Sequence, residues 1–594
     1  MKTRLFPAGA CIGLALIVLV AAVGCREERV IVSGPDRYLA ASAITPGMRG
    51  FGRTVFRGDT IEDFDVTVIS VMRNWAPGSD MILVEVRHPV VDEAGIIAGM
   101  SGSPVYINGR LIGAVAYGWS FSKRAIAGIT PIAEMLAAPP VVPAGGAGGL
   151  LDPAAGTAGP APAGTPRPLT MPLTVGGGSP AFRQFLTAEL ARRNLPFAVV
   201  AAGAPAAGAA PAAAGGLAEG SAVAVKLVTG DLDLSAVGTV TCIDRGTVYA
   251  FGHPFTLGGA VSLPMATAWV HTVIASMDTS FKLAAAGPTL GEFTADYARA
   301  IRGTLGRTPR TVPVEAVITN ADTGVRVTRT FAVAHDRRWT GFMTFLAVYA
   351  ALDETPVYGG DLSAWIDAEI EAEGVPLITG HDFLLTGGRP GFGNVIPLWD
   401  RIEFLMDNPY RPLDIRSVRF RITVKSGRAA RIIERASADR RRVAPGGTVN
   451  ITLELRPYRG AIVREILPVT LPADMPEGPV RIDLYNGLAA PGHDVRRAPG
   501  RRRPETIAQA AALLNDPYDA NVLVVDLVTP ATGLVVEGEE FTEVPESVAR
   551  IYRDLQDGRY TPTGEFLRER RVIVQKGVIG GEAAVEVVVD RFSP

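Results

Sequence analysis

The stretch GMSGSPVYINGRLIG, residues 99–113, is the one from which the fold around it can be inferred. Gly99 and Gly102 flank Ser101, and glycine allows the backbone a tight turn with positive φ. Such a turn is expected to leave the Ser101 hydroxyl exposed. It also lets neighbouring N–H groups converge on one point, as an oxyanion hole requires.

The second half of this stretch predicts a β-hairpin. Pro104 is expected to begin a strand, where its missing N–H is tolerated. Asn108-Gly109 then separates two apolar runs, and this dipeptide favours the type I′ turn of a two-residue hairpin. Ser101 is therefore expected on a loop that enters a rigid hairpin, a suitable place for a nucleophile. Gly-x-Ser-Gly turns also occur in β proteins without chemistry, so a purely structural turn remains the alternative.

Two motifs resemble one known family. Gly99–Pro104 resembles the nucleophile motif of the SpoIVB-type serine peptidases, a trypsin-like group, and AFGHPF at 250–255 resembles the Gly-His-Pro motif that carries their catalytic histidine. The similarity spans roughly residues 45–136 and 220–306. It implies a trypsin-like pair of small β-barrels and acyl-enzyme hydrolysis of peptide bonds. Ser101 would be the nucleophile, His253 the base, and the N–H groups of Gly99 and Ser101 the oxyanion donors.

The chain departs from the family pattern in two ways. The serine motif precedes the histidine motif here, whereas the family has the opposite order. The family's Asp-Pro, which supplies the triad acid, is replaced by His88-Pro89. Asp92 is near in sequence but nothing fixes its direction, and His88 could itself serve as a substitute base if His253 packs elsewhere. A slow enzyme, a recruited acid and an inactive protein therefore remain open.

The N-terminus predicts export. Lys2 and Arg4 precede an apolar run at 10–23, which is typical of a secretory signal. Residues 22–25, Ala-Val-Gly-Cys, resemble a bacterial lipobox in which Cys25 would carry the lipid. A simply cleaved signal or an uncleaved anchor is the alternative, and in each case the mature chain is expected to work outside the cytoplasmic membrane, with a membrane-anchored lipoprotein of the cell envelope as the favoured form.

Composition excludes several classes of function. The 594 residues carry a formal charge of −2, which argues against nucleic acid as the main partner. Of three cysteines only Cys242 lies beyond the signal and lipobox, so no intramolecular disulfide is expected. The six histidines show no metal-ligand spacing, and neither a metal nor a cofactor is expected.

The fold class expected is mainly β, with the two barrels followed by an immunoglobulin-like β-sandwich region. The expected divisions are a signal peptide at 1–24, a tether at 25–43, the serine half at 44–138, a low-complexity linker with one helix at 139–219, the histidine half at 220–336, a mixed helical and β connector at 337–415, and a sandwich-like accessory region at 416–594.

Two functions are compatible with these residues. One is an envelope serine endopeptidase with a protein or peptide as substrate, for which the family resemblance implies narrow specificity and a regulatory role. The other is a catalytically inactive surface lipoprotein whose β domains bind proteins or peptides. The oligomeric state, the substrate and the biological process are not indicated by the sequence.

Overall fold

A computed structural model describes residues 31–34, 36–137, 166–203, 216–354, 361–387, 396–498, 500–536, 538–542, 544–553 and 560–593. The predicted signal peptide, Cys25 and most of the two low-complexity stretches lie outside these residues. No helix within them is long and apolar enough to span a membrane. The molecule is mainly β, as predicted.

The first six strands close into a barrel. They are β1 (Arg49–Arg57), β2 (Thr60–Ala76), β3 (Ser79–Arg87), β4 (Pro104–Ile107), β5 (Arg110–Gly118) and β6 (Ile126–Pro131). Pairing runs β4-β1-β2-β3-β6-β5, and β5 returns to β4, so no edge is left open. The inward apolar side chains form one core; the short helix α1 (Pro89–Ala94) joins β3 to β4, and a second short helix, α2 (Ile132–Leu136), follows β6.

The hairpin predicted from Asn108-Gly109 is confirmed. β4 ends at Ile107 and β5 begins at Arg110, with φ of 52° at Asn108 and 72° at Gly109. Both central residues are thus left-handed, as a type I′ turn requires. This turn fixes the register of β4, the strand that follows the serine motif directly.

A second set of six strands also closes into a ring. It contains β10 (Ala222–Gly230), β11 (Asp233–Asp244), β12 (Thr247–Ala250), β13 (Gly259–Ile274), β14 (Phe281–Tyr297) and β15 (Ala300–Leu305). The pairing order is β10-β13-β14-β15-β12-β11, and β11 pairs back with β10. The histidine motif begins at the end of β12.

This second ring is part of a thirteen-stranded sheet. On one side lie β8 (Met171–Gly176) and β9 (Phe197–Ala201), and on the other β17 (Arg326–Ala334), β16 (Thr311–Asn320), β20 (Ile415–Ser426), β18 (Asp361–Ala372) and β19 (Ile378–Gly387). Helices α3 (Pro180–Arg192), α4 (Thr340–Asp353) and α5 (Ile396–Met406) pack into the same core. The helix predicted at 180–194 is present, but the surrounding linker also holds the parallel strands β8 and β9, which were not predicted.

One strand lies elsewhere than predicted. The alternating residues at 417–424 were assigned to the accessory sandwich, yet β20 pairs in parallel with β16 and antiparallel with β18. Alternating apolar and polar residues predict a half-buried strand, and such a strand fits either sheet. Periodicity alone therefore does not identify the strands with which it pairs.

The C-terminal region is two sheets packed face to face. One contains β24 (Val463–Thr470), β23 (Thr448–Pro457), β21 (Ala430–Ala438) and β29 (Val578–Gly580). The other contains β22 (Arg442–Val443), β30 (Glu582–Val589), β25 (Gly478–Asn486), β26 (Val522–Val536), β27 (Glu539–Thr542) and β28 (Tyr560–Val574). Their inner faces share one apolar core. Helices α6 (Ala490–Arg497), α7 (Ile507–Leu514) and α8 (Glu546–Arg553) and the short η3 (Gly487–Ala489) lie outside it. Two further minor elements belong to the N-terminal part: η1 (Ala41–Ala43) precedes β1, and β7 (Arg167–Pro168) pairs with β5.

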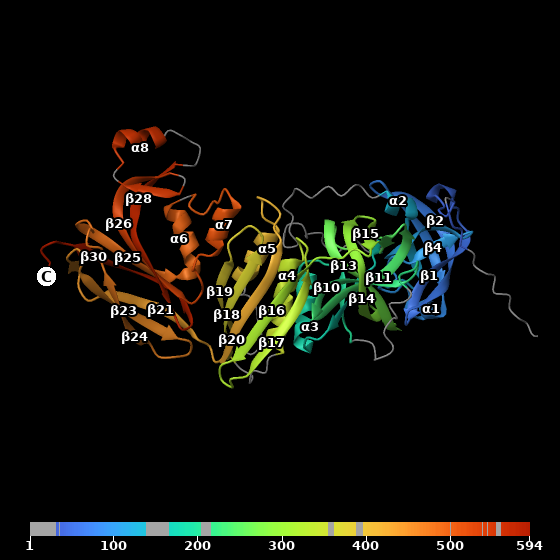
Figure 1. Cartoon of the computed structure of the whole chain (residues 1–594), viewed down its shortest axis with the longest axis horizontal. Helices are drawn as coiled ribbons and strands as arrows, with labels where there is room; N and C mark the ends of the chain where they lie inside the picture. The colour runs from blue at the N-terminus through green and yellow to red at the C-terminus, as the bar shows by residue number, and fades with distance from the viewer. Residues whose placement is uncertain are drawn as a thin grey trace, which may run out of the picture.

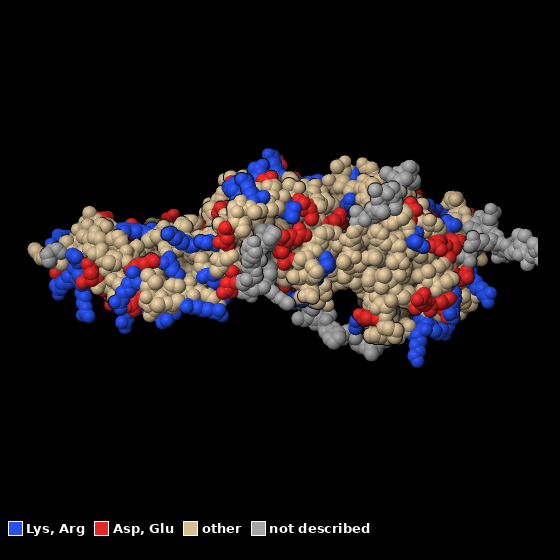
Figure 2. Space-filling view, turned by 90° about the horizontal axis from the view of Figure 1, so that it is seen from below, with Lys and Arg blue, Asp and Glu red and all other residues tan. Residues whose placement is uncertain are grey.

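The units follow one another along an elongated molecule. Figure 1 shows the blue first barrel at one end, the green second ring beside it, the yellow extension of the large sheet next, and the orange and red sandwich at the other end. Acidic and basic side chains are interspersed on the face in Figure 2, with Lys and Arg more numerous towards the sandwich. The two motif-bearing halves are therefore neighbours in space.

Candidate functional site

The serine loop, residues 99–103, is a tight turn held by its own backbone. Gly99 and Gly102 have φ of +94° and +93°, a region that favours glycine. The N–H of Met100 donates to Ile97 O (3.0 Å), and that of Ser103 donates to Met100 O (2.9 Å). The prediction that these two glycines permit a tight turn is confirmed.

The two N–H groups predicted as oxyanion donors are free of partners among the described residues. Ala98 O accepts the N–H of Lys282 (3.0 Å), and Met100 O accepts that of Ser103. In a trans peptide the N–H points opposite to the C=O, so fixing these carbonyls fixes the directions of the Gly99 and Ser101 N–H groups. No hydrogen bond is recorded for either N–H. The loop thus offers two oriented donors, as an oxyanion hole requires.

The side chain of Ser101 is buried, which corrects the expectation of an exposed hydroxyl. Ser101 is 0% exposed, and its Oγ has no hydrogen-bond partner among the described residues. The cover comes from the second half of the chain: the N–H of Thr239 donates to Ser101 O (2.8 Å), and Thr241 Oγ1 donates to Gly102 O (2.8 Å). The glycine pattern predicts the turn, but it does not indicate which other segments of the chain pack over that turn.

His253 lies directly after a second tight turn, in which Phe251 and Gly252 have φ of +68° and +69°. Its Nδ1 is 2.8 Å from Pro254 O. A carbonyl can only accept, so the proton is on Nδ1 and Nε2 keeps its lone pair, the form that a general base needs. Nε2 is buried without a partner, and burial lowers the pKa of His253 to about 4. The imidazole is therefore neutral at pH 7.

The structure brings the two motif loops to one junction at Thr239 of β11. Its N–H binds Ser101 O, its carbonyl accepts the N–H of Phe251 (3.3 Å), and its Oγ1 donates to Gly99 O (2.9 Å). Gly252 packs on Ala114 and Ala116 of β5. Val115, which lies between these two alanines, is hydrogen-bonded to Gly102 and Ser103 of the serine loop. Ser101 and His253 are not hydrogen-bonded to each other; their Oγ and Nε2 are each unpartnered in the described chain.

No carboxylate orients the imidazole, because the Pro254 carbonyl occupies Nδ1. A carboxylate organises the rest of the histidine loop instead. Asp296 of β14 accepts the N–H groups of Phe255 (2.8 Å), Thr256 (2.7 Å) and Gly258 (2.8 Å). It is 1% exposed, and burial raises its pKa. Nothing in the sequence indicated Asp296, which lies 43 positions after His253 on a different strand.

His88 and Asp92 have other recorded contacts. His88 is the N-cap of α1, where its Nδ1 accepts the N–H of Val90 (3.3 Å), and its ring stacks on Phe56 at 4.3 Å. Asp92 is exposed and pairs with Arg87 (3.3 Å). Their suggested roles as triad substitutes draw no support from these contacts.

A buried lysine that the sequence did not single out lies beside the serine loop. Lys282 is 0% exposed, and its Nζ donates to Thr54 Oγ1 (2.7 Å) and Thr239 Oγ1 (3.4 Å). A Cβ added to Gly99 would lie 3.2 Å from Lys282 Cδ, so the stem packs directly against that glycine. Burial lowers the pKa of Lys282 to about 7.

A hollow of about 330 Å³ lies next to the serine loop. It is formed by the segment before Gly99, the β5–β6 loop and the tip of the β13–β14 hairpin, and it includes Ala98 and Ser280. Phe121 and Met277 line it and are 77% and 93% exposed. Neither Ser101 nor His253 lines this hollow, so the site is closed in this conformation.

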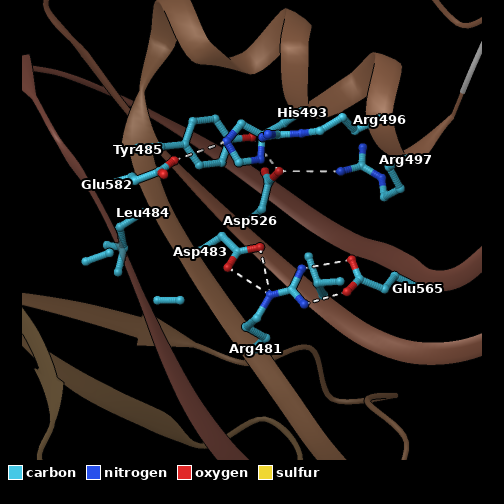
Figure 3. Close-up of a pocket in the computed structure, with 13 residues that line it drawn as sticks. Arg481, Asp483, Leu484, Tyr485, His493, Arg496, Arg497, Asp526, Glu565 and Glu582 are labelled. Carbon is cyan, nitrogen blue, oxygen red and sulfur yellow. Dashed lines mark hydrogen bonds and ion pairs between the residues drawn. The ribbon is translucent and has the colours of Figure 1, made fainter.

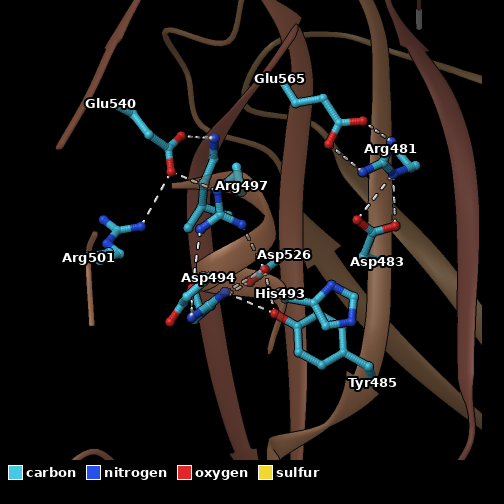
Figure 4. Close-up of polar contacts among 12 residues, drawn as sticks. Arg481, Asp483, Tyr485, His493, Asp494, Arg497, Arg501, Asp526, Glu540 and Glu565 are labelled. Atoms are coloured by element: carbon cyan, nitrogen blue, oxygen red, sulfur yellow. Dashed lines mark hydrogen bonds and ion pairs between the residues drawn. The ribbon is translucent and has the colours of Figure 1, made fainter. Parts of the chain in front are cut away.

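A larger hollow, of about 580 Å³, lies on the outer face of the sandwich under α6. Figure 3 shows Arg481 held by Asp483 and Glu565, and His493 beside Tyr485, with ring centroids 3.9 Å apart. Figure 4 shows the adjoining network in which Arg497 contacts Asp494, Asp526 and Glu540. Most of these charges are neutralised by one another, which is typical of a structural ion-pair network.

Comparison with known proteins gives a match that covers the part of the chain that contains the serine loop. No curated protein and no solved structure matches the chain. A family match covers 41–135, which includes the first barrel and Ser101 but not His253. Residues 41–135 thus form a domain that matches the model of the SpoIVB peptidase S55 family.

Proposed function

We propose that this protein is a serine endopeptidase of the SpoIVB type, with Ser101 as nucleophile and His253 as general base. The observation that carries the proposal is the serine loop itself. It presents free, oriented N–H groups at Gly99 and Ser101, inside a domain that matches a serine peptidase family. A purely structural turn has no need to leave two buried donors unpaired.

The proposed reaction gives each of the two loops a role. Ser101 Oγ bonds to the scissile carbonyl carbon while its proton passes to His253 Nε2, and the oxyanion is held by the two N–H groups. The imidazolium then protonates the leaving amine as the C–N bond breaks. Water hydrolyses the acyl-enzyme with the same base. The Pro254 carbonyl keeps the proton on Nδ1, which takes over the tautomer-fixing part of the role of the missing acid.

The arrangement of domains supports a related proposal. We propose that the two closed rings of strands form a trypsin-like pair and that the two C-terminal sheets, which share one core, form an immunoglobulin-like accessory sandwich. We further propose export through the N-terminal signal and lipid attachment at Cys25. A Cys25→Ser variant is expected to leave the membrane fraction and to lose incorporation of labelled palmitate.

A catalytically inactive binding protein is the second candidate. The burial of Ser101 and His253 and the absence of an orienting carboxylate favour it. In the peptidase proposal these same facts mean that the loops must move before a substrate reaches Ser101. The two candidates therefore differ in whether Ser101 ever becomes reactive in the folded protein.

Labelling with a fluorophosphonate separates them. In this reaction an Oγ–P bond forms, the P–F bond breaks, and fluoride leaves as His253 takes the proton. Wild type is expected to be labelled at one site, and Ser101→Ala and His253→Ala to remain unlabelled. Ser103→Ala is the matched control, since Ser103 is an equally buried, unpartnered hydroxyl of the same loop. An unlabelled wild type that is folded by circular dichroism would establish the binding-protein reading.

A further inference from the structure

Lys282 of β14 is buried where the second ring packs on β1 and the serine loop of the first barrel, an unusual place for a lysine. Among the residues that the structure describes, its ammonium group has hydroxyl acceptors only, from Thr54 of β1 and Thr239 of β11, and the serine loop contributes backbone alone. No acidic or basic side chain of these elements is among its recorded partners, and burial is the single cause of its pKa shift. Burying an amine without a carboxylate costs stability, so its presence calls for another explanation.

The position of Lys282 relative to the serine loop offers that explanation. Its own N–H fixes Ala98 O, and thereby the direction of the Gly99 N–H. Its stem packs on Gly99, and its Nζ binds the Thr239 hydroxyl that donates to Gly99 O. The ammonium group is thus linked through one hydroxyl to the carbonyl of Gly99, the residue that carries a predicted oxyanion donor, in an environment from which water is excluded. Electrostatic stabilisation is strongest in such an environment.

We propose that Lys282 is a positioning residue for the oxyanion hole: its ammonium group, acting through Thr239, holds Gly99 and supports negative charge at the serine loop. The inference rests on the proposed peptidase function and adds a working pH range to it. His253 must be neutral to accept a proton, and Lys282 must be charged to support the oxyanion. Reactivity should therefore rise through the pKa of His253, about 4, and fall through that of Lys282, about 7.

The test is the rate of fluorophosphonate labelling between pH 3.5 and 9. Wild type is expected to give a bell-shaped profile. Lys282→Met keeps the stem that packs on Gly99 and removes the charge, so we expect a plateau about tenfold lower with no fall above pH 7. Lys282→Arg keeps a permanent charge, and its rate should stay within a few-fold of the wild-type plateau up to pH 9. If the Lys282→Arg variant does not fold, the pH profile of the Lys282→Met variant is sufficient to test the role of Lys282.

The outcomes separate this inference from the function on which it rests. A Lys282→Met profile that still falls near pH 7, at whatever rate, would assign the fall to another group and overturn the role of Lys282. That result would leave the peptidase proposal standing if Ser101→Ala abolishes labelling. Absence of labelling in folded wild type at every pH would overturn both.

Discussion

Gly102 has no room for a side chain. A Cβ at this position would overlap the carbonyl oxygen of Thr239, and its φ of +93° adds backbone strain. Gly246, in the β11–β12 turn, has a similar φ of +80° but open space around it. A comparison of alanine substitutions at Gly102 and Gly246 therefore distinguishes the cost of backbone strain from the cost of steric overlap.

We expect Gly246→Ala to lower the free energy of unfolding by about 1–2 kcal/mol, the cost of a left-handed alanine. Gly102→Ala should cost more, because the strands that carry the two motifs must move apart, and it should abolish labelling of Ser101. Urea denaturation and labelling measure both. Equal losses of stability in the two variants would contradict the close contact at Thr239.

Lys282 should also make stability depend on pH. Its pKa in the folded protein is about 7, below the ordinary 10.5, so between these values the unfolded chain binds more protons. The lysine's contribution to the free energy of unfolding therefore rises from pH 7 to about 10.5, and is lowest below pH 7. Lys282→Met should be more stable than wild type, by the largest margin below pH 7. A margin that does not change with pH would contradict the buried titration.

At the scale of elements, the loop after β12 depends on Asp296. Replacing this carboxylate by an amide leaves one acceptor for three N–H groups and brings a donor against them. We expect Asp296→Asn to cost about 1–3 kcal/mol in stability. Labelling should slow by about ten- to a hundredfold, because His253 loses its fixed position.

Asp231→Asn is the control for this change. Asp231 accepts the N–H of Thr330 in an exposed turn of the same sheet. It should leave the labelling rate within twofold of wild type. If the two variants slow labelling equally, Asp296 has no special part in placing His253.

Elements whose conformation is set by neighbouring residues could be predicted from the sequence. Elements that depend on pairing with distant strands could not. Asn108-Gly109 specified a hairpin because its turn conformation is set within two residues, and α4 lies within the connector for which helical and β elements were expected. β8 and β9 were missed because Met171–Gly176 is a short apolar run between low-complexity stretches, and its partner in β11 is some sixty residues away. The burial of Ser101 and the positions of Asp296 and Lys282 depend on that same kind of distant packing.

At the scale of the molecule, the barrels and the sandwich have separate cores. The core of the large sheet contains Leu234, and that of the sandwich contains Ile482; both side chains are 0% exposed. We expect two calorimetric transitions. Ile482→Ala should lower one of them, by about 2–5 kcal/mol in local stability, and leave labelling of Ser101 unchanged.

Leu234→Ala is the reciprocal variant, since β11 carries both Leu234 and Thr239. It should lower the other transition and slow labelling. A single transition that shifts in both variants would mean that the sandwich and the peptidase region unfold as one unit.

The junction at Thr239 has a consequence for how such a protein is switched on. One half of the chain supplies the nucleophile and the oxyanion donors, and the other supplies the base, the loop brace and the buried charge. Neither half holds a complete reactive centre. The proposed chemistry at Ser101 therefore requires that both halves have been made and have folded against each other, so a half-finished chain is expected to be unreactive.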